Sequence, residues 1–319
     1  MSHNHSIAAG VACGAGAGAV WGLVFLAPEL VREFSALQLS LGRYLCYGVF
    51  SIALVAPAWR RLAPLVGPRE WLALAWLALA GNLLYYVLLA SAIHLGGIAL
   101  TSLVIGFLPV AVTIVGSRDA GAVPLSRLAP SLVLCSAGAL CIGWQALAVP
   151  PGAVAAQLAG LACAIGALVS WTCYAVGNAR WLARLERVTA HEWNLLTGVM
   201  TFAQALACVP LALALHDTAH DAAAWAKLAA VSAGVAILAS LVGNALWNRM
   251  SRLLPLTLAG QMILFETLFA LAYGFAWERR WPTPAEAAAF VLVVAGVMAC
   301  LAAHRRPLRV AVVSSSPPT

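Results

Sequence analysis

The stretch Ala9–Trp21, AGVACGAGAGAVW, recurs 150 residues later as Ala159–Trp171, AGLACAIGALVSW, and this repetition decides the fold. Seven of the thirteen aligned positions are identical. Alanine-rich sequence produces chance matches, but shared glycine, cysteine and tryptophan positions are harder to obtain by chance. We therefore predict two related halves, residues 1–149 and 150–303, followed by a disordered cytoplasmic tail, residues 304–319.

Further dipeptides fall at corresponding places in the two halves. They are Gly81-Asn82 with Gly243-Asn244, and Ala137-Gly138 with Ala295-Gly296. If each half holds five membrane spans, the second half must run through the membrane in the opposite sense. Inverted repeats of this kind place a substrate site near the bilayer midplane, between the halves. A duplicated scaffold without transport activity is the alternative.

The composition indicates a membrane protein. Of the 319 residues, 63% are hydrophobic and 9% charged, and the mean hydropathy is +0.93, whereas a soluble domain is about 25% charged. The apolar runs are long and continuous rather than alternating, which favours helices over barrel strands. The net charge of +7 does not indicate nucleic-acid binding, because the basic residues lie singly or in small groups between the apolar runs.

Ten apolar runs are each close to the roughly 20 residues that a spanning helix needs. We expect spans at about 7–31, 36–58, 71–93, 97–116, 127–147, 154–179, 191–215, 226–248, 255–276 and 286–303. The boundary between the third and fourth spans rests only on Gly96-Gly97. The predicted fold class is an all-α membrane protein of ten transmembrane helices in two inverted five-helix repeats.

The arginine and lysine residues predict the orientation. With a cytoplasmic N-terminus, thirteen of these residues fall on the inner side, four fall on the outer side and Arg43 falls inside the second span. Cytoplasmic loops carry an excess of basic residues, so we expect both termini to be cytoplasmic. We also expect a multi-pass protein of a bacterial inner membrane that functions as a monomer.

Several short motifs in order resemble the EamA type of the drug/metabolite transporter superfamily. The motifs are Val20-Trp21-Gly22, Arg43, Leu108-Pro109, Ala137-Gly138 and Ala295-Gly296, and the resemblance covers about residues 8–303. It implies ten spans in a five-plus-five repeat and a transport activity. Within the superfamily the chain looks most like the aromatic amino-acid exporters, which implies export of amino acids.

One position departs from the family pattern. The family often has Glu-Pro in the ninth span, whereas this chain has Glu266-Thr267, with a proline only at Pro255. A gating role for a proline beside Glu266 is therefore in doubt.

Polar and aromatic residues inside the spans are the candidate site residues. Asn82 and Tyr86 lie four residues apart and share a helix face, and an equivalent face is expected in the eighth span. Aromatic faces can stack on a ring or attract an ammonium group. The complete candidate set is Trp21, Asn82, Tyr86, Trp171, Tyr174, Asn178, Asn244, Trp247, Asn248 and Glu266. Interhelical hydrogen bonds and ordinary packing are the competing explanations for all of these residues.

Two charged residues fall inside predicted spans. Glu266 is the one acidic residue deep in a span, where a carboxylate costs about 2.5–3.5 kcal/mol. It is a candidate for proton coupling, for contact with a substrate amino group, or for a structural ion pair. We expect the Arg43 side chain to extend outward to the membrane surface. Contact with a substrate carboxylate is the alternative.

The predicted function is export of amino acids, aromatic ones foremost, by alternating access. Export of other metabolites or amphipathic cations by the same fold is a second possibility, and a channel is a third. The sequence has no HExxH, GxSxG or P-loop motif, so no enzyme activity and no catalytic residue is predicted. Its eight cysteines form no CxxC pair, and no metal or cofactor is expected.

Overall fold

The computed structural model describes residues 2–116, 125–147, 153–253, 262 and 264–305. Nearly all of these residues are helical, and no strand occurs among them. Six helical runs in this part of the chain are long and apolar enough to cross a membrane, judged by length and composition. They are residues 8–30, 36–65, 68–105, 154–182, 190–215 and 222–247. The count of ten spans stays a prediction.

The first half of the chain begins with two long helices and continues through shorter ones. The elements are α1 (Ser2–Leu30), α2 (Ala36–Val55), η1 (Ala56–Ala58), α3 (Trp59–Leu62), η2 (Ala63–Leu65), α4 (Pro68–Ala78), η3 (Leu79–Leu83), α5 (Leu84–Ile105), α6 (Leu108–Gly116) and α7 (Leu125–Leu147). The segment η3 is π-helical and joins α4 to α5 without a break. Gly97 has a φ of +82° inside α5, a backbone conformation that glycine adopts freely. It breaks the helix where the sequence predicts the end of the third span.

The rest of the chain also alternates long helices with shorter segments. They are α8 (Val154–Leu182), α9 (Ala190–Leu215), α10 (Ala222–Val235), η5 (Ala236–Gly243), α11 (Asn244–Leu253), α13 (Leu264–Glu278) and α14 (Pro284–Arg305). The segment η5 is also π-helical, and it ends at Gly243, just as η3 contains Gly81. The predicted ninth span, 255–276, lies partly outside the described residues. Pro255 lies outside them altogether.

Capping boxes fix where two of the long helices begin. The Ser35 hydroxyl accepts a hydrogen bond from the backbone N–H of Gln38, and the Gln38 side chain accepts one from the N–H of Ser35. Thr189 and Glu192 make the same reciprocal pair at the start of α9. Each box satisfies two backbone donors that the first turn leaves without helical partners.

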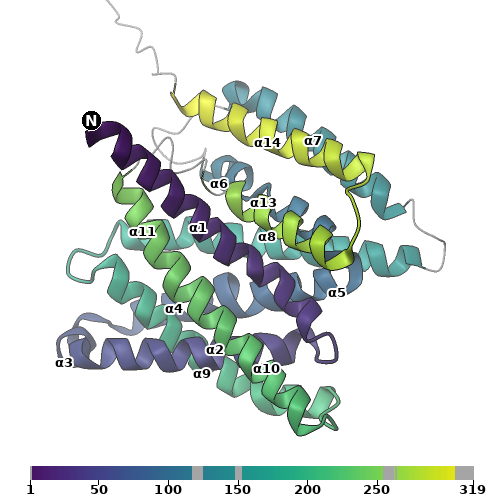
Figure 1. The fold of residues 1–319 in the computed structure, drawn as a ribbon. Helices are drawn as coiled ribbons and strands as arrows, with labels where there is room; N and C mark the ends of the chain where they lie inside the picture. The colour runs from purple at the N-terminus through teal and green to yellow at the C-terminus, as the bar shows by residue number, and fades with distance from the viewer. Residues whose placement is uncertain (1, 117–124, 148–152, 254–261, 263, 306–319) are drawn as a thin grey trace, which may run out of the picture.

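The main helix contacts join one half of the chain to the other. The helix pairs are α5 with α8, α7 with α14, α2 with α9, and α1 with both α11 and α13. Figure 1 shows α1 running beside α11 and α13, and α7 and α14 lying together at one edge of the bundle. Small residues permit close packing: the Gly18 and Gly22 positions lie directly on the backbone of α13.

The largest hydrophobic cluster lies where helices of both halves meet. It contains Phe25 and Tyr44, together with Tyr85, Tyr86 and Ala236. Tyr86 is completely buried. Two partly buried tryptophans, Trp21 and Trp171, pack against this same cluster.

Candidate functional site

Tyrosine rings from α2 and α5 form the centre of the candidate site. Tyr44 and Tyr86 meet edge to face, with ring centroids 6.0 Å apart, an arrangement that aromatic pairs favour. The Tyr44 hydroxyl donates to the backbone carbonyl of Asn82 (3.0 Å). Tyr44 was not among the sequence candidates; its position next to Arg43 is the one signal that could have identified it.

The Arg43 side chain does not extend outward to the membrane surface, so this prediction is wrong. Its guanidinium carbon lies 4.3 Å from the ring centroid of Tyr86 and 5.2 Å from that of Tyr44. Its Nε and Nη1 atoms are buried and have no hydrogen-bond partner within the described part of the chain. Cation–π attraction to two rings holds the side chain inside the bundle. The charge therefore remains at the centre of the aromatic cluster.

Glu266 lies in the first turn of α13, which packs on α1. A Cβ built at Gly18 would lie 2.8 Å from the Glu266 backbone nitrogen, so the glycine lets the carboxylate-bearing helix approach α1. The carboxylate is within electrostatic range of Arg43 and Tyr85. It makes no direct ion pair or hydrogen bond with Arg43 in the part of the chain that the structure describes. One positive and one negative group thus lie within electrostatic range of each other.

Trp171 and Tyr174 supply further aromatic surface from α8. Their rings meet edge to face at 5.9 Å between centroids. The Tyr174 ring lies directly against Gly81 in η3, where any larger side chain would displace the ring. The Tyr174 side chain is therefore turned toward η3, beside Asn82.

Trp21 links α1 to the second half of the chain. Its indole nitrogen donates to the carbonyl of Ala239 in η5 (2.9 Å), and its ring lies 5.2 Å from that of Trp247. Trp247 belongs to a separate small cluster with Met250 and Met262. The two tryptophans therefore extend the aromatic region from the central cluster toward α11.

The asparagine candidates differ in what their side chains do. The Asn82 amide donates to the Thr201 hydroxyl on α9 (2.8 Å), and the Asn178 amide oxygen accepts from the Trp193 indole (3.0 Å). Both are interhelical hydrogen bonds, and Trp193 belongs to a different hydrophobic cluster. Asn244 and Asn248 lie on α11, but their side chains are outside what the structure describes. A substrate contact by any of the four stays a prediction.

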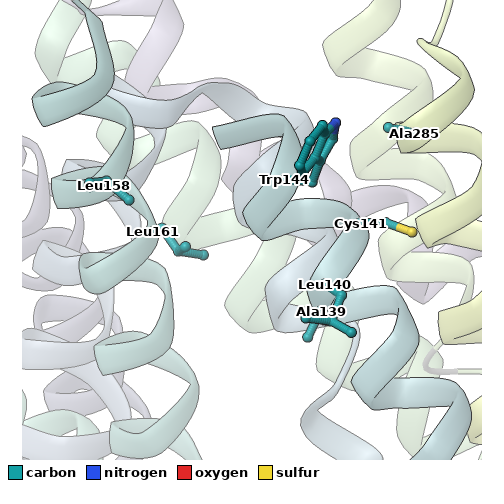
Figure 2. A pocket seen from close by; sticks show the side chains of 7 residues that line it. All are labelled: Ala139, Leu140, Cys141, Trp144, Leu158, Leu161 and Ala285. Carbon is teal, nitrogen blue, oxygen red and sulfur yellow. The ribbon is translucent and has the colours of Figure 1, made fainter. Parts of the chain in front are cut away.

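A groove of about 660 Å³ lies apart from this site, between α7 and α8. Figure 2 shows Trp144 and Leu140 on α7, Leu158 and Leu161 on α8, and Ala285 on α14 around it. Ala139 and Cys141 complete the lining. No charged side chain lines the groove.

Known proteins match this chain in sequence and in fold. Residues 8–144 match the EamA-like transporter family. The inner membrane protein YtfF of Escherichia coli (strain K12) is 32% identical over 315 residues, which cover 92% of this chain and 95% of YtfF. A crystal structure covers 93% of this chain and 99% of its own, with a TM-score of 0.59 at 20% identity; that likeness concerns the fold alone. The chain belongs to the EamA-like transporter family of the drug/metabolite transporter superfamily, as a multi-pass protein of the bacterial inner membrane.

Proposed function

We propose that the protein exports amino acids, aromatic ones foremost, by alternating access around a site between two inverted halves. The observation that carries the proposal is the central aromatic cluster, in which Tyr44, Tyr86, Trp21 and Trp171 come from both halves of the chain. Aromatic walls suit a solute with a ring, because edge-to-face and stacked contacts add to the energy of apolar burial. In transporters with inverted repeats, the substrate site lies at the interface between the repeats.

The helix pairing supports the two-halves part of the proposal. In the proposed repeat, α1 corresponds to α8 and α13 corresponds to α6. The contact between α1 and α13 therefore has a counterpart in the contact between α8 and α6, and both contacts are present. In the same repeat, α2 corresponds to α9 and α7 corresponds to α14. Each of these pairs is in contact, as a two-fold relation between the halves predicts. This pattern is expected of a chain with internal two-fold pseudo-symmetry.

The π-helical segments add a second line of support. η3 and η5 occur at corresponding places in the proposed repeats, and π-helical turns occur frequently at functional sites. Carbonyls in both segments accept hydrogen bonds from side chains of other helices. Ser170 donates to Ala80 (2.7 Å), and Trp21 donates to Ala239 in the other half. Both segments therefore contribute contacts to the region where the halves meet.

Export of amphipathic cations is the second candidate, because Glu266 could face an ammonium group. Arg43 weighs against this candidate, since a solute carrying only positive charge would have to approach a guanidinium that lies over Tyr86. The pair of opposite charges favours a solute that carries both. We therefore place amino acids first.

Counterflow in proteoliposomes tests the proposal. Purified protein is reconstituted and loaded with unlabelled phenylalanine, and the entry of labelled phenylalanine, tryptophan, serine and a quaternary ammonium drug is measured. We expect saturable counterflow of the two aromatic amino acids. Saturable movement of the drug alone would favour the second candidate, and non-saturating flux of every solute would indicate a channel.

A further inference from the structure

The position of Arg43 defines a binding point for an anion. It is the eighth residue of α2, about 10 Å along the helix from Ala36 at 1.5 Å per residue. At this depth its Nε and Nη1 atoms are buried, and neither meets an acceptor among the described residues. Buried charged donors without acceptors are costly, and natural structures retain them chiefly where they have a task.

The neighbouring tyrosines stabilise the charge, and the Tyr86 side chain also hydrogen-bonds with Arg43, but the Nε and Nη1 atoms are left without acceptors among the described residues. Tyr44 and Tyr86 attract the cation through their π faces, but this attraction does not supply the oxygen lone pairs that N–H groups need. A planar guanidinium presents five donors, and a carboxylate can accept from it at two points. The missing partner of Arg43 is therefore best matched by a carboxylate from outside the chain.

Glu266 supplies the complementary charge. It is close enough to Arg43 for electrostatic interaction, yet the two side chains are not joined as an ion pair within the described structure. The two unpaired charges of opposite sign match a solute with a positive and a negative end. A cation alone would leave Arg43 unsatisfied, and an anion alone would repel Glu266.

We propose that Arg43 binds the α-carboxylate of the transported amino acid and that Glu266 binds its α-ammonium group. This assignment rests on the proposed function and adds a selection rule to it. The protein should recognise the zwitterionic head of the solute, while the aromatic cluster recognises the side chain. Aromatic solutes that lack either charged group should bind poorly.

The first test compares solutes in the unaltered protein. Labelled phenylalanine is competed with phenethylamine, which lacks the carboxylate, and with 3-phenylpropionate, which lacks the ammonium group. Each should need at least about a tenfold higher concentration than phenylalanine, the effect of losing one charge-assisted hydrogen bond. Competition by all three at equal concentrations would overturn the assignment and leave aromatic transport intact. Failure of the unaltered protein to bind or move phenylalanine would instead overturn the proposed function.

The second test uses two variants with opposite expectations. R43Q should weaken phenylalanine binding at least about tenfold, while phenethylamine binding should stay the same or become stronger, because the variant removes a like charge. E266Q should weaken phenylalanine binding, while 3-phenylpropionate binding should stay the same or become stronger for the same reason. Equal weakening of all three solutes in both variants would indicate a structural role and overturn the assignment.

Two further variants serve as controls. R184Q removes an arginine that also lies over an aromatic ring, Trp181 at 5.7 Å, but near the end of α8 and exposed; its binding should match that of the unaltered protein. R43K keeps the charge without the planar fork, and it covers the case in which R43Q fails to fold. We expect R43K to retain a preference for phenylalanine over phenethylamine that is weaker than in the unaltered protein. An unchanged or absent preference would contradict the proposed contact.

Discussion

The indole nitrogen of Trp21 donates a 2.9 Å hydrogen bond to the backbone carbonyl of Ala239. This bond joins α1, in the first half of the chain, to the π-helical segment η5 in the second. Ala239 lies in a π-helical segment, a kind of segment that is frequent at functional sites, and its carbonyl accepts the indole N–H. The bond therefore holds together two elements that line the candidate site.

Replacing Trp21 with phenylalanine should destabilise the protein by about 1–3 kcal/mol, because the Ala239 carbonyl loses its donor while remaining buried. Thermal unfolding in detergent, followed by tryptophan fluorescence, measures the change. W171F is the matched control, since no hydrogen bond from the Trp171 indole occurs in the described structure. An equal loss of stability in W21F and W171F would mean that ring volume matters and the hydrogen bond does not.

Gly18 should not tolerate a side chain. A Cβ at this position would lie 2.5 Å from the Phe265 Cβ and 2.8 Å from the Glu266 nitrogen, so Gly18→Ala must push α13 away from α1. We expect a lower melting temperature and weaker substrate binding. Gly234→Ala is the control, because its Cβ would meet nothing within 4 Å; it should gain about 0.5–1 kcal/mol from the better helix former. A melting temperature of G18A equal to that of the unaltered protein would contradict this packing.

The sequence predicts much of the backbone because apolar runs and helix punctuation are local signals. The expected spans 36–58 and 191–215 correspond to α2 at Ala36–Val55 and α9 at Ala190–Leu215, and Gly97 breaks α5 where the glycine pair predicts. The π-helical segments have no comparable signal, since a shift in hydrogen bonding leaves composition and periodicity unchanged.

Side-chain partners were harder to predict than the helices. Arg43 was expected to reach the membrane surface, but two tyrosine rings hold its side chain inside the bundle. One of them belongs to Tyr86, which is 43 residues away in the sequence. Helical spacing places Trp171, Tyr174 and Asn178 on one face, yet it cannot tell which partner each side chain meets. Asn178 meets Trp193, and that contact depends on how α8 and α9 pack together.

The hydrogen bond between Asn178 and Trp193 leads to a prediction about stability. N178A should lower stability by about 1–3 kcal/mol, because it leaves the buried indole N–H without an acceptor. W193F removes the other partner. In the double variant the two losses should be less than additive, as expected of residues in contact. Thermal unfolding of the four proteins measures the coupling, and strict additivity would show that the bond contributes nothing.

Trp171 should contribute to selectivity more than to stability. Its ring is partly buried and meets Tyr174 at its edge, so W171A removes aromatic surface beside η3. We expect the apparent affinity for phenylalanine and tryptophan to fall by about tenfold, and that for serine to change far less. Counterflow in proteoliposomes gives both values. Trp281→Ala, at a side chain that is 91% exposed, should leave all three unchanged. An equal loss for serine would assign Trp171 to packing alone.

The connection between α13 and α14 carries an ion pair whose pH dependence follows from its chemistry. Arg280 donates two 2.7 Å hydrogen bonds to Glu286, and these bonds, together with Glu278, raise the pKa of Arg280 above its ordinary value. Because the pKa is raised, the contribution of the pair to stability is complete below the ordinary pKa of an arginine. It is lost only as the pH rises through the higher pKa of the folded state.

Glu286→Gln should therefore destabilise the protein to the same extent at pH 6 and at pH 9. We expect about 1–2 kcal/mol rather than the 3–5 kcal/mol of a fully buried pair, because the Arg280 side chain is 36% exposed while that of Glu286 is 3% exposed. Glutamine still offers an oxygen to the Thr283 N–H, which donates to Glu286 at 2.7 Å, so the change removes the charge and keeps the cap. A loss that shrinks at pH 9 would mean that Arg280 titrates there, contrary to the direction of its shift.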